Sequence, residues 1–200
     1  MAPPPPPLPP LDPAITLTDP DGKPVAASSL WADGRPLVLY LLRRPGCLLC
    51  RATAQKLWAA EAAITAAAGG GAARLVCVAH EWLPAEMAAF REGFWPGPVY
   101  KDADKALFAA LGDGTVRRAS ALSLLNPFSR MWAHAKEAKK SVTDSNFTGD
   151  GLTLGGVMVV VGGVPVWRFA EKQFGDAPTP EEVVEAVRAA AGSAAGEAGK

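Results

Sequence analysis

The chain contains 200 residues, of which 49% are apolar, and its 20 lysines and arginines balance its 20 aspartates and glutamates. This length and apolar content suit one compact domain with a sizeable core. With no net charge, the chain has neither a basic field to attract nucleic acid or anionic lipid nor an acidic field to attract cations, so we expect no nucleic-acid partner.

The cysteine content and the N-terminal residues indicate the compartment. Three cysteines are an odd number and too few for the disulfide framework of a small secreted domain, which favours a reducing environment. The first residues lack the basic and apolar regions of a signal peptide. The most apolar stretch, residues 152–167, is interrupted by glycines and Pro165 and is shorter than a membrane-spanning helix. We therefore expect a cytoplasmic protein without a membrane span.

Residues 1–13 are rich in proline and predict an extended polyproline arm. Leu8 and Leu11 fall on one face of a helix with three residues per turn, so residues 3–11 suit docking into the aromatic groove of a polyproline-binding partner. The alternative is a solubilising, disordered start. In either case we expect the arm to make no hydrogen bonds to the sheet of its own domain.

The first half of the domain alternates strands and helices. Residues 16–18 and 24–26 predict a small hairpin around an Asp-Pro-Asp-Gly turn. The continuous apolar run 36–42 is typical of a central strand buried on both faces. Residues 47–67 predict one long helix, and residues 74–79 predict a second buried strand, so that the segment forms a strand–helix–strand unit.

The next segment predicts two short helices and a strand. We expect a helix over residues 84–91, a short edge strand at residues 99–100 and a helix over residues 104–111. Asp104 is the expected N-cap of the last of these helices and Gly112 its C-cap.

The C-terminal part predicts a helix, a hairpin and a final helix. Residues 129–140 are expected to be helical, and residues 157–161 and 164–169 form the clearest hairpin signal in the chain. Pro165 marks the second strand of this hairpin as an edge strand. A last helix over residues 180–191 begins after Thr179 as N-cap.

This order of elements predicts the domain organisation and the fold. We expect an arm over residues 1–13, a domain over residues 14–190 and a disordered Gly/Ala tail over residues 191–200. A strand–helix–strand unit, an insertion, a hairpin and a helix follow the chain order of a thioredoxin-like α/β fold, with a central mixed sheet flanked by helices. The inserted strand and helix, residues 99–111, are additions typical of its peroxiredoxin-like variant.

The pair Cys47 and Cys50 lies between a buried strand and a helix, which is where a redox Cys-x-x-Cys motif occurs. At a helix N-terminus, free N–H groups and the macrodipole stabilise a thiolate, so Cys47 is the candidate nucleophile. Cys50, one turn later, can displace whatever Cys47 has bonded and is the candidate resolving thiol. The nearby Arg43, Arg44 and Arg51 add positive charge.

Two other interpretations of the cysteines remain open. The pair can be structural, or it can form half of a zinc site completed by Cys77 and His80. Against zinc, Cys77 stands inside an apolar strand, where a free cysteine behaves as a small hydrophobic residue. His80 follows the carboxyl end of that strand and can approach Cys47, although such a histidine, like Glu81 beside it, more often belongs to the surface.

The segment Leu42-Arg43-Arg44-Pro45-Gly46-Cys47-Leu48-Leu49-Cys50-Arg51 closely resembles the peroxiredoxin-like, AhpC/TSA-type family that contains prostamide/prostaglandin F synthase and the selenoprotein U relatives. Residues 147–157, with their Leu-Gly-Gly entry to a strand, and residues 171–176 resemble the same family. The resemblance spans residues 14–190. It is specific, because ordinary thioredoxins and peroxiredoxins have neither the RRxGCxxCR motif nor that strand entry.

The resemblance implies an oxidoreductase that reduces peroxide bonds of organic peroxides or prostaglandin endoperoxides. Cys47 would attack the O–O bond and Cys50 would resolve the product, with thioredoxin as reductant and NADPH as the indirect electron source, so no bound cofactor and no metal are expected. The chain lacks a Pro-x-x-x-Thr-x-x-Cys motif, which argues against efficient turnover of hydrogen peroxide. Gly155-Gly156 stands where thioredoxins carry a cis-proline, so the docking groove is expected to differ.

A second function class remains compatible with the sequence. A non-catalytic thioredoxin-like module can be held in a larger, cytoskeletal or ciliary assembly through the polyproline arm, because fold alone does not separate an enzyme from a binding module. Retention of both cysteines and the flanking arginines favours the enzyme, whereas the arm favours the module.

Overall fold

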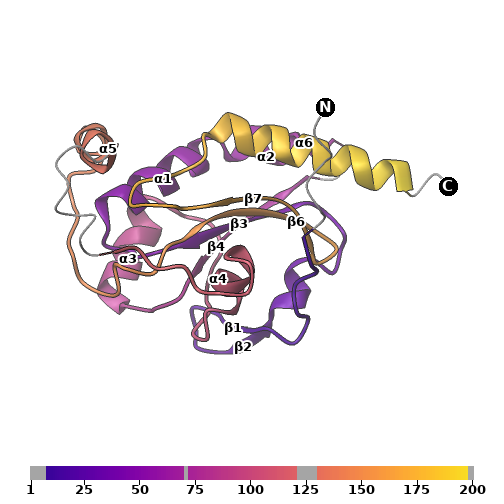
Figure 1. Ribbon diagram of the computed structural model, residues 1–200, viewed down its shortest axis with the longest axis horizontal. Coiled ribbons are helices and arrows are strands. Elements are labelled where there is room, and N and C mark those ends of the chain that lie inside the picture. The colour runs from indigo at the N-terminus through magenta and orange to yellow at the C-terminus, as the bar shows by residue number, and fades with distance from the viewer. Residues whose placement is uncertain (1–7, 70–71, 121–129, 198–200) are drawn as a thin grey trace.

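The computed structural model describes residues 8–69, 72–120 and 130–197 (Figure 1). Its centre is a mixed seven-stranded sheet of order β2-β1-β5-β4-β3-β6-β7. The strands are β1 Thr16–Thr18, β2 Pro24–Ala26, β3 Leu37–Leu42, β4 Arg74–Ala79, β5 Val99–Lys101, β6 Gly156–Val161 and β7 Val164–Ala170. The short strand β2 and the proline-containing strand β7 are therefore the two edges of the sheet.

The central strand β3 is buried on both faces. It runs parallel to β4 and antiparallel to β6, and its side chains alternate between two core clusters. Val38, Tyr40 and Leu42 belong to the first cluster, and the intervening leucines belong to the second. Because both faces are covered, the strand needs an unbroken apolar run, which is the pattern that predicted it.

Helices cover both faces of the sheet. They are α1 Leu48–Ala59, α2 Glu61–Ala66, α3 Pro84–Gly93, α4 Ala106–Leu111, α5 Arg130–Ala138 and α6 Pro180–Glu197, with a 3₁₀ turn η1 at Ala27–Leu30. Figure 1 shows α1, α2 and α6 along one face and α4 on the other. Among the described residues no helix is long and apolar enough to cross a lipid bilayer.

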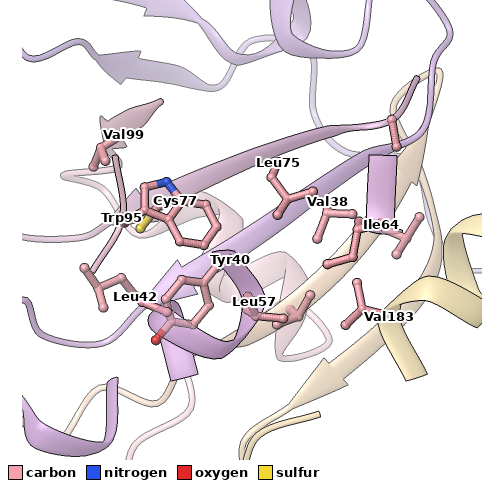
Figure 2. Packing of buried hydrophobic residues seen from close by; sticks show 14 of the residues in the cluster. Val38, Tyr40, Leu42, Leu57, Ile64, Leu75, Cys77, Trp95, Val99 and Val183 are labelled. Carbon is pink, nitrogen blue, oxygen red and sulfur yellow. The ribbon is translucent and has the colours of Figure 1, made fainter. Parts of the chain in front are cut away.

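The first core cluster lies beneath α1, α2 and α6 and includes both cysteines of the motif. Figure 2 shows Tyr40, Cys77 and Trp95 in its interior, with Leu57 of α1 nearby. The rings of Tyr40 and Trp95 lie 5.7 Å apart, centroid to centroid. Trp58 of α1 packs against the Trp95 ring with 5.2 Å between centroids, which links α1 to this aromatic part of the core.

Two expectations for the first half are wrong in detail. The helix predicted over residues 47–67 is two helices, because the backbone at Ala60 has φ −95° and ψ 6° and ends α1 before α2 begins. Tertiary packing overrides the high helix propensity of this alanine-rich segment, and Leu57 and Ile64, on either side of the break, are both fully buried. The strand predicted at an edge, β5, is internal, because Thr18 of β1 pairs with Lys101.

The N-cap predicted for α4 is also wrong. Asp104 does not cap this helix; instead, the buried Asp102 carboxylate accepts the N–H groups of Ala106 and Leu107 at 3.0 and 2.8 Å. Lys105 adopts a left-handed conformation with φ 58°, which displaces the helix start by one residue and brings the earlier aspartate to the helix end. Gly112 is the C-cap, as predicted.

The C-terminal helix begins where the sequence predicts and extends further than predicted. Thr179 Oγ1 accepts the Glu182 N–H and Glu182 returns a bond to the Thr179 N–H, a capping box that confirms the predicted start of α6. The helix continues to Glu197 rather than ending at Ala191, so the segment 191–197 of the predicted disordered tail is helical.

The predicted arm is partly integrated into the domain. Leu11 is buried in the second cluster, and its N–H donates to the Gly163 carbonyl in the β6–β7 turn at 2.8 Å. The expectation that Leu11 faces a partner is therefore wrong. Its side chain instead fills the space beside the hairpin turn. The hydrogen bond is made to a turn residue and not to a strand, so it does not contradict the expectation that the arm makes no hydrogen bonds to the sheet. Residues 1–7, which hold the first prolines, lie outside the described residues.

Candidate active site

The cysteine pair lies where the sequence predicts it, between β3 and α1. Cys47 is the N-cap of α1, with extended backbone angles of φ −74° and ψ 128°, and its carbonyl accepts the Arg51 N–H at 2.9 Å. Cys50 follows in the first helical turn. Both cysteines are buried free thiols, which is the reduced form of a Cys-x-x-Cys pair.

The two thiols have opposite acid–base properties. A hydrogen bond from the Cys50 thiol holds the pKa of Cys47 well below its usual value, against burial, and the charges of Arg43 and Arg44 act in the same direction. The pKa of Cys50 is raised by that same hydrogen bond, by burial and by the charge on Cys47. Cys47 is therefore the thiolate of the pair and Cys50 the thiol that donates to it.

Arg43 is the cation next to the thiolate. Its Nη2 donates to the Sγ atom of Cys47 at 3.0 Å. Its Cζ atom lies 4.7 Å from the centroid of the Phe174 ring, so the guanidinium is held between a sulfur atom and an aromatic face. The side chain is buried, and a buried cation at this distance favours the ionised form of the sulfur.

Arg44 shapes the wall of the site. Its Nη1 donates to the Phe147 carbonyl at 2.9 Å, and its Cζ atom lies 5.4 Å from the centroid of the Phe147 ring. It adds to the positive charge felt by Cys47, but its contacts mainly position residue 147.

Arg51 serves a structural purpose. It is fully buried, and its guanidinium donates to the Pro45 carbonyl at 2.8 Å, to the Asp144 carboxylate at 2.8 Å and to the Glu86 carboxylate at 3.3 Å. These bonds connect the loop before Cys47 with α3 and with the segment after α5. Its charge is directed to these oxygen atoms and not to the sulfur of Cys47.

A cavity of about 650 Å³ opens over Cys47. Its floor is formed by Cys47 and Arg43, which are 5% and 4% exposed. Its rim carries two aromatic residues, Trp132 and Phe147, which are 52% and 91% exposed. Between floor and rim the wall is mainly apolar, with Leu48, Leu49, Leu152 and Phe174. The cavity therefore suits a largely apolar molecule that presents one reactive group to Cys47.

One wall of the cavity is the loop after α5, and a network of polar contacts holds it. The Asn146 N–H donates to the Gly46 carbonyl at 2.8 Å, directly beside Cys47. Both Glu81 carboxylate oxygens accept the Asp150 N–H at 3.1 Å. The Asp150 carboxylate in turn binds Lys105 and Thr153. Glu81 is thus an anchor for the loop and not a group that approaches Cys47.

The other wall includes α5, which lies beside α1 at the left of Figure 1. His134 on this helix bonds through Nδ1 to the Gly175 carbonyl at 2.7 Å. Buried Ala138 at the helix end packs with Ala52 of α1. These contacts connect α5 to both α1 and the segment that carries Phe174.

The described part of the chain offers no set of ligands for the zinc site that Cys77 and His80 would complete. Cys77 lies fully buried on β4 in the same cluster as the cysteine pair, and burial raises the pKa of its thiol. His80 packs edge-on against Phe108, 5.3 Å between ring centroids, and burial lowers its pKa to about 4. No three Cys, His, Asp or Glu side chains among the described residues lie together in a way that could hold a metal.

Two residues of the site were missed by sequence reasoning. Glu171, directly after β7, accepts the Gly155 N–H through Oε2 at 3.2 Å; burial raises its pKa to about 7, while Arg43 opposes that rise. The Tyr40 hydroxyl donates to the Cys50 carbonyl at 3.0 Å. In the sequence, residues 171–176 stand out only as a segment of family resemblance and Tyr40 only as part of an apolar strand, so neither Glu171 nor Tyr40 carries a chemical signal of its own.

Comparison with known proteins places the site in context. The AhpC/TSA antioxidant enzyme family matches residues 57–173, a range that begins after the cysteine pair. The prostamide/prostaglandin F synthase of Salmo salar is 35% identical over 181 residues, which cover 88% of this chain and 86% of that protein. The peroxiredoxin-like 2A of Rattus norvegicus is 30% identical over 164 residues, covering 81% of this chain and 66% of that protein.

Solved structures confirm the predicted fold class. Peroxiredoxin Q of Xanthomonas campestris aligns with a TM-score of 0.57 at 17% identity, over 90% of this chain and 96% of that one. A secreted disulfide oxidoreductase of Mycobacterium tuberculosis aligns with a TM-score of 0.50 at 19% identity, over 88% and 96% of the two chains. The fold is thioredoxin-like, in its peroxiredoxin-like variant, with a mixed sheet flanked by helices.

Proposed function

The chain belongs to the AhpC/TSA antioxidant enzyme family, and on that premise we propose that it reduces the O–O bonds of organic peroxides, including prostaglandin-endoperoxide-type substrates, through Cys47 and Cys50. The observation that carries this proposal is the contact between Arg43 and the Cys47 sulfur at the floor of an apolar cavity. That arrangement combines an ionised nucleophile with space for an organic molecule.

In the first step the Cys47 thiolate attacks one oxygen of the peroxide bond. An S–O bond forms and the O–O bond breaks. With a hydroperoxide, the second oxygen leaves as an alkoxide that takes up a proton to become an alcohol, and Cys47 becomes a sulfenic acid. With a cyclic endoperoxide, the oxygen that bonds to sulfur stays attached to the substrate. Arg43 stabilises the negative charge that moves from sulfur to oxygen.

In the second step Cys50 attacks the Cys47 sulfur. A disulfide forms, and water or the substrate alcohol leaves. Before the reaction, the hydrogen bond to the Cys47 thiolate and its negative charge both help to keep Cys50 protonated. Oxidation of Cys47 removes that charge and that acceptor, so Cys50 becomes easier to deprotonate at the moment when it is needed.

The cycle then requires a dithiol reductant. We assign this role to thioredoxin, with NADPH as the indirect electron source and no cofactor bound to the chain. The reduced cysteine pair needs a reducing compartment, and the proposed location is the cytoplasm. The alternative of a non-catalytic module docked through residues 3–11 loses one of its two apolar anchors, since Leu11 is buried in the domain.

The test is a thioredoxin-coupled assay that follows NADPH oxidation with a panel of organic hydroperoxides, a prostaglandin endoperoxide and hydrogen peroxide. We expect turnover of the organic substrates, little turnover of hydrogen peroxide, and complete loss in Cys47→Ser. Cys50→Ser is expected to accumulate a sulfenic acid or a mixed disulfide at Cys47, detectable by mass spectrometry. Cys77→Ser is the matched control and keeps its activity. Activity that survives in Cys47→Ser would refute the proposal.

A further inference from the structure

Two exposed aromatic side chains flank the mouth of the cavity. Among the described residues, three large hydrophobic side chains are exposed, and two of them, Trp132 and Phe147, lie at this rim. The third, Val166, lies on the edge strand β7. Large apolar side chains that gather at one exposed place mark a surface that contacts a partner or a membrane.

The loop after α5 holds Phe147 in its exposed position. Arg44 donates to the Phe147 carbonyl and lies over its ring. The Asn146 Oδ1 atom accepts the Thr148 N–H at 3.0 Å and closes the tip of the loop, and the Asn146 N–H is bonded to the Gly46 carbonyl. The outward direction of the ring is therefore a built feature of the loop.

On α5, Trp132 begins a basic stripe. Trp132, Lys136 and Lys139 are all exposed and follow each other at intervals of four and three positions. The Lys139 N–H donates to the Ala135 carbonyl at 3.0 Å, so the helical spacing extends to Lys139 and the three side chains share one face. The ammonium groups of both lysines make no hydrogen bond or ion pair with any residue that the structure describes.

The carboxylates of these two segments are already neutralised. Glu137 forms an ion pair with Lys140 at 2.6 Å, and both residues line the groove on the other side of α5. Asp144 pairs with the buried Arg51 at 2.8 Å. The face that carries Trp132 is therefore locally positive, although the chain as a whole has no net charge.

We propose that the aromatic–basic face, formed by Trp132, Lys136, Lys139 and Phe147, binds the surface of an anionic phospholipid bilayer. The two aromatic side chains enter the headgroup region, and the two ammonium groups pair with the negative groups of the lipids. The contact is peripheral, and the cavity over Cys47 opens between its two aromatic anchors. This inference concerns membrane binding alone and does not depend on peroxide reduction.

Two features favour a bilayer over a folded protein as the partner. Lysine is depleted in the centres of protein interfaces, whereas each lysine close to an anionic bilayer adds to the binding free energy. Figure 1 shows α5 at one end of the molecule, away from the sheet, where it can meet a flat surface. Two aromatic anchors beside exposed cations are the pattern of reversible interfacial binding.

The first experiment measures co-sedimentation of the full chain with vesicles of phosphatidylcholine, with and without phosphatidylserine. We expect binding to the anionic vesicles that weakens as salt is added. Lys136→Gln and Lys139→Gln should each lower the partition coefficient about fivefold. The control is Lys23→Gln, at an exposed lysine in the turn between β1 and β2, and it should bind as the wild type does.

The second experiment tests the aromatic anchors on the same vesicles. Phe147→Ser should lower the partition coefficient about tenfold, whereas Val166→Ser, at the exposed apolar residue outside the face, should leave it unchanged. Lipids brominated in their acyl chains should quench part of the tryptophan fluorescence of the bound wild type. Trp132→Phe keeps an aromatic anchor, so it should stay bound and lose this quenching.

The outcomes separate the possibilities. Equal sedimentation with neutral and anionic vesicles, or unchanged binding in both lysine variants, would overturn the inference. So would a face that binds purified thioredoxin through Lys136 and Lys139 but does not bind vesicles, since it would then be a protein interface. Membrane binding that depends on the face in a chain that reduces no peroxide would support the inference and refute the proposed function.

Discussion

The Nη2 atom of Arg43 lies 3.0 Å from the Sγ atom of Cys47, and both side chains are buried. Removing the charge while keeping a polar side chain, in Arg43→Gln, should raise the pKa of Cys47 and lower the fraction of this thiol that is ionised at mildly acidic pH. Alkylation of Cys47 at mildly acidic pH, followed by peptide mass spectrometry, measures this. Arg35→Gln, at an exposed arginine paired with Asp33, is the control. Unchanged alkylation in Arg43→Gln would contradict the assignment.

The hydrogen bond from Cys50 makes a separate prediction about the same thiolate. Because the first contribution to the low pKa of Cys47 is this bond, Cys50→Ala should raise the pKa of Cys47 more than Cys50→Ser, in which a hydroxyl can still donate. The pKa of Cys47 in each variant is measured from the pH dependence of thiolate absorbance. Both variants lack the resolving thiol. Identical titration curves for the two variants would show that the bond does not set the pKa.

The glycine pair at the entry of β6 is required by backbone packing. A Cβ atom on Gly155 would overlap the Leu41 carbonyl oxygen of the neighbouring strand, which cannot move without breaking the sheet. Gly155→Ala should therefore lower the free energy of unfolding by about 3 kcal/mol or more, measured by urea denaturation. Gly93→Ala is the matched control, since no atom lies within 4 Å of a Cβ placed there. Equal stability of the two variants would argue against this close approach.

The raised pKa of buried Glu171 predicts that the free energy of unfolding depends on pH. Its pKa is about 7 rather than 4.5 because it is buried, so the folded state keeps the proton that the unfolded state has already lost between these values. Stability contributed by this group is therefore full below pH 4.5 and is lost as the pH rises to about 7. The stability of the wild type relative to Glu171→Gln should fall by roughly 2 to 4 kcal/mol across this range. Urea melts at several pH values give the difference, and a constant difference would contradict the prediction.

The burial of Leu11 predicts that the N-terminal arm contributes to the stability of the folded domain. Its side chain is buried in the second cluster, whereas Leu8 is only half-buried. Leu11→Ala should cost about 2 to 4 kcal/mol of unfolding free energy, and Leu8→Ala less than about 1 kcal/mol. Thermal or urea denaturation of both variants provides the comparison. Similar losses of unfolding free energy in the two variants would contradict this prediction and would favour a partner-facing Leu11.

The parts of the structure that were predicted correctly depend on neighbours in sequence. The apolar run of β3, the Gly162-Gly163 turn and the capping residues Thr179 and Glu182 each carry their signal within a few positions. The location of Cys47 at a strand end and helix start follows from the same local patterns.

The parts that were missed depend on contacts between distant segments. Arg43 meets Phe174, and Glu171 meets Gly155, only after the sheet has formed. Lys105 takes its left-handed conformation, and Asp102 becomes the cap of α4, through a backbone geometry that residue types do not signal. The cavity could not be predicted for the same reason, since its walls come from α1, α5 and the loop after α5.

The two edge strands bear on how the protein behaves at high concentration. β2 has only three residues and begins with Pro24, and β7 carries Pro165 beside an irregularity in its pairing with β6. A proline cannot donate a ladder hydrogen bond, and short or bulged edges pair poorly with a foreign strand. Extension of the sheet by a second chain is therefore unfavourable at both ends. The central strand β3 is long and apolar, but the short or proline-containing edge strands β2 and β7 thus oppose aggregation through the sheet.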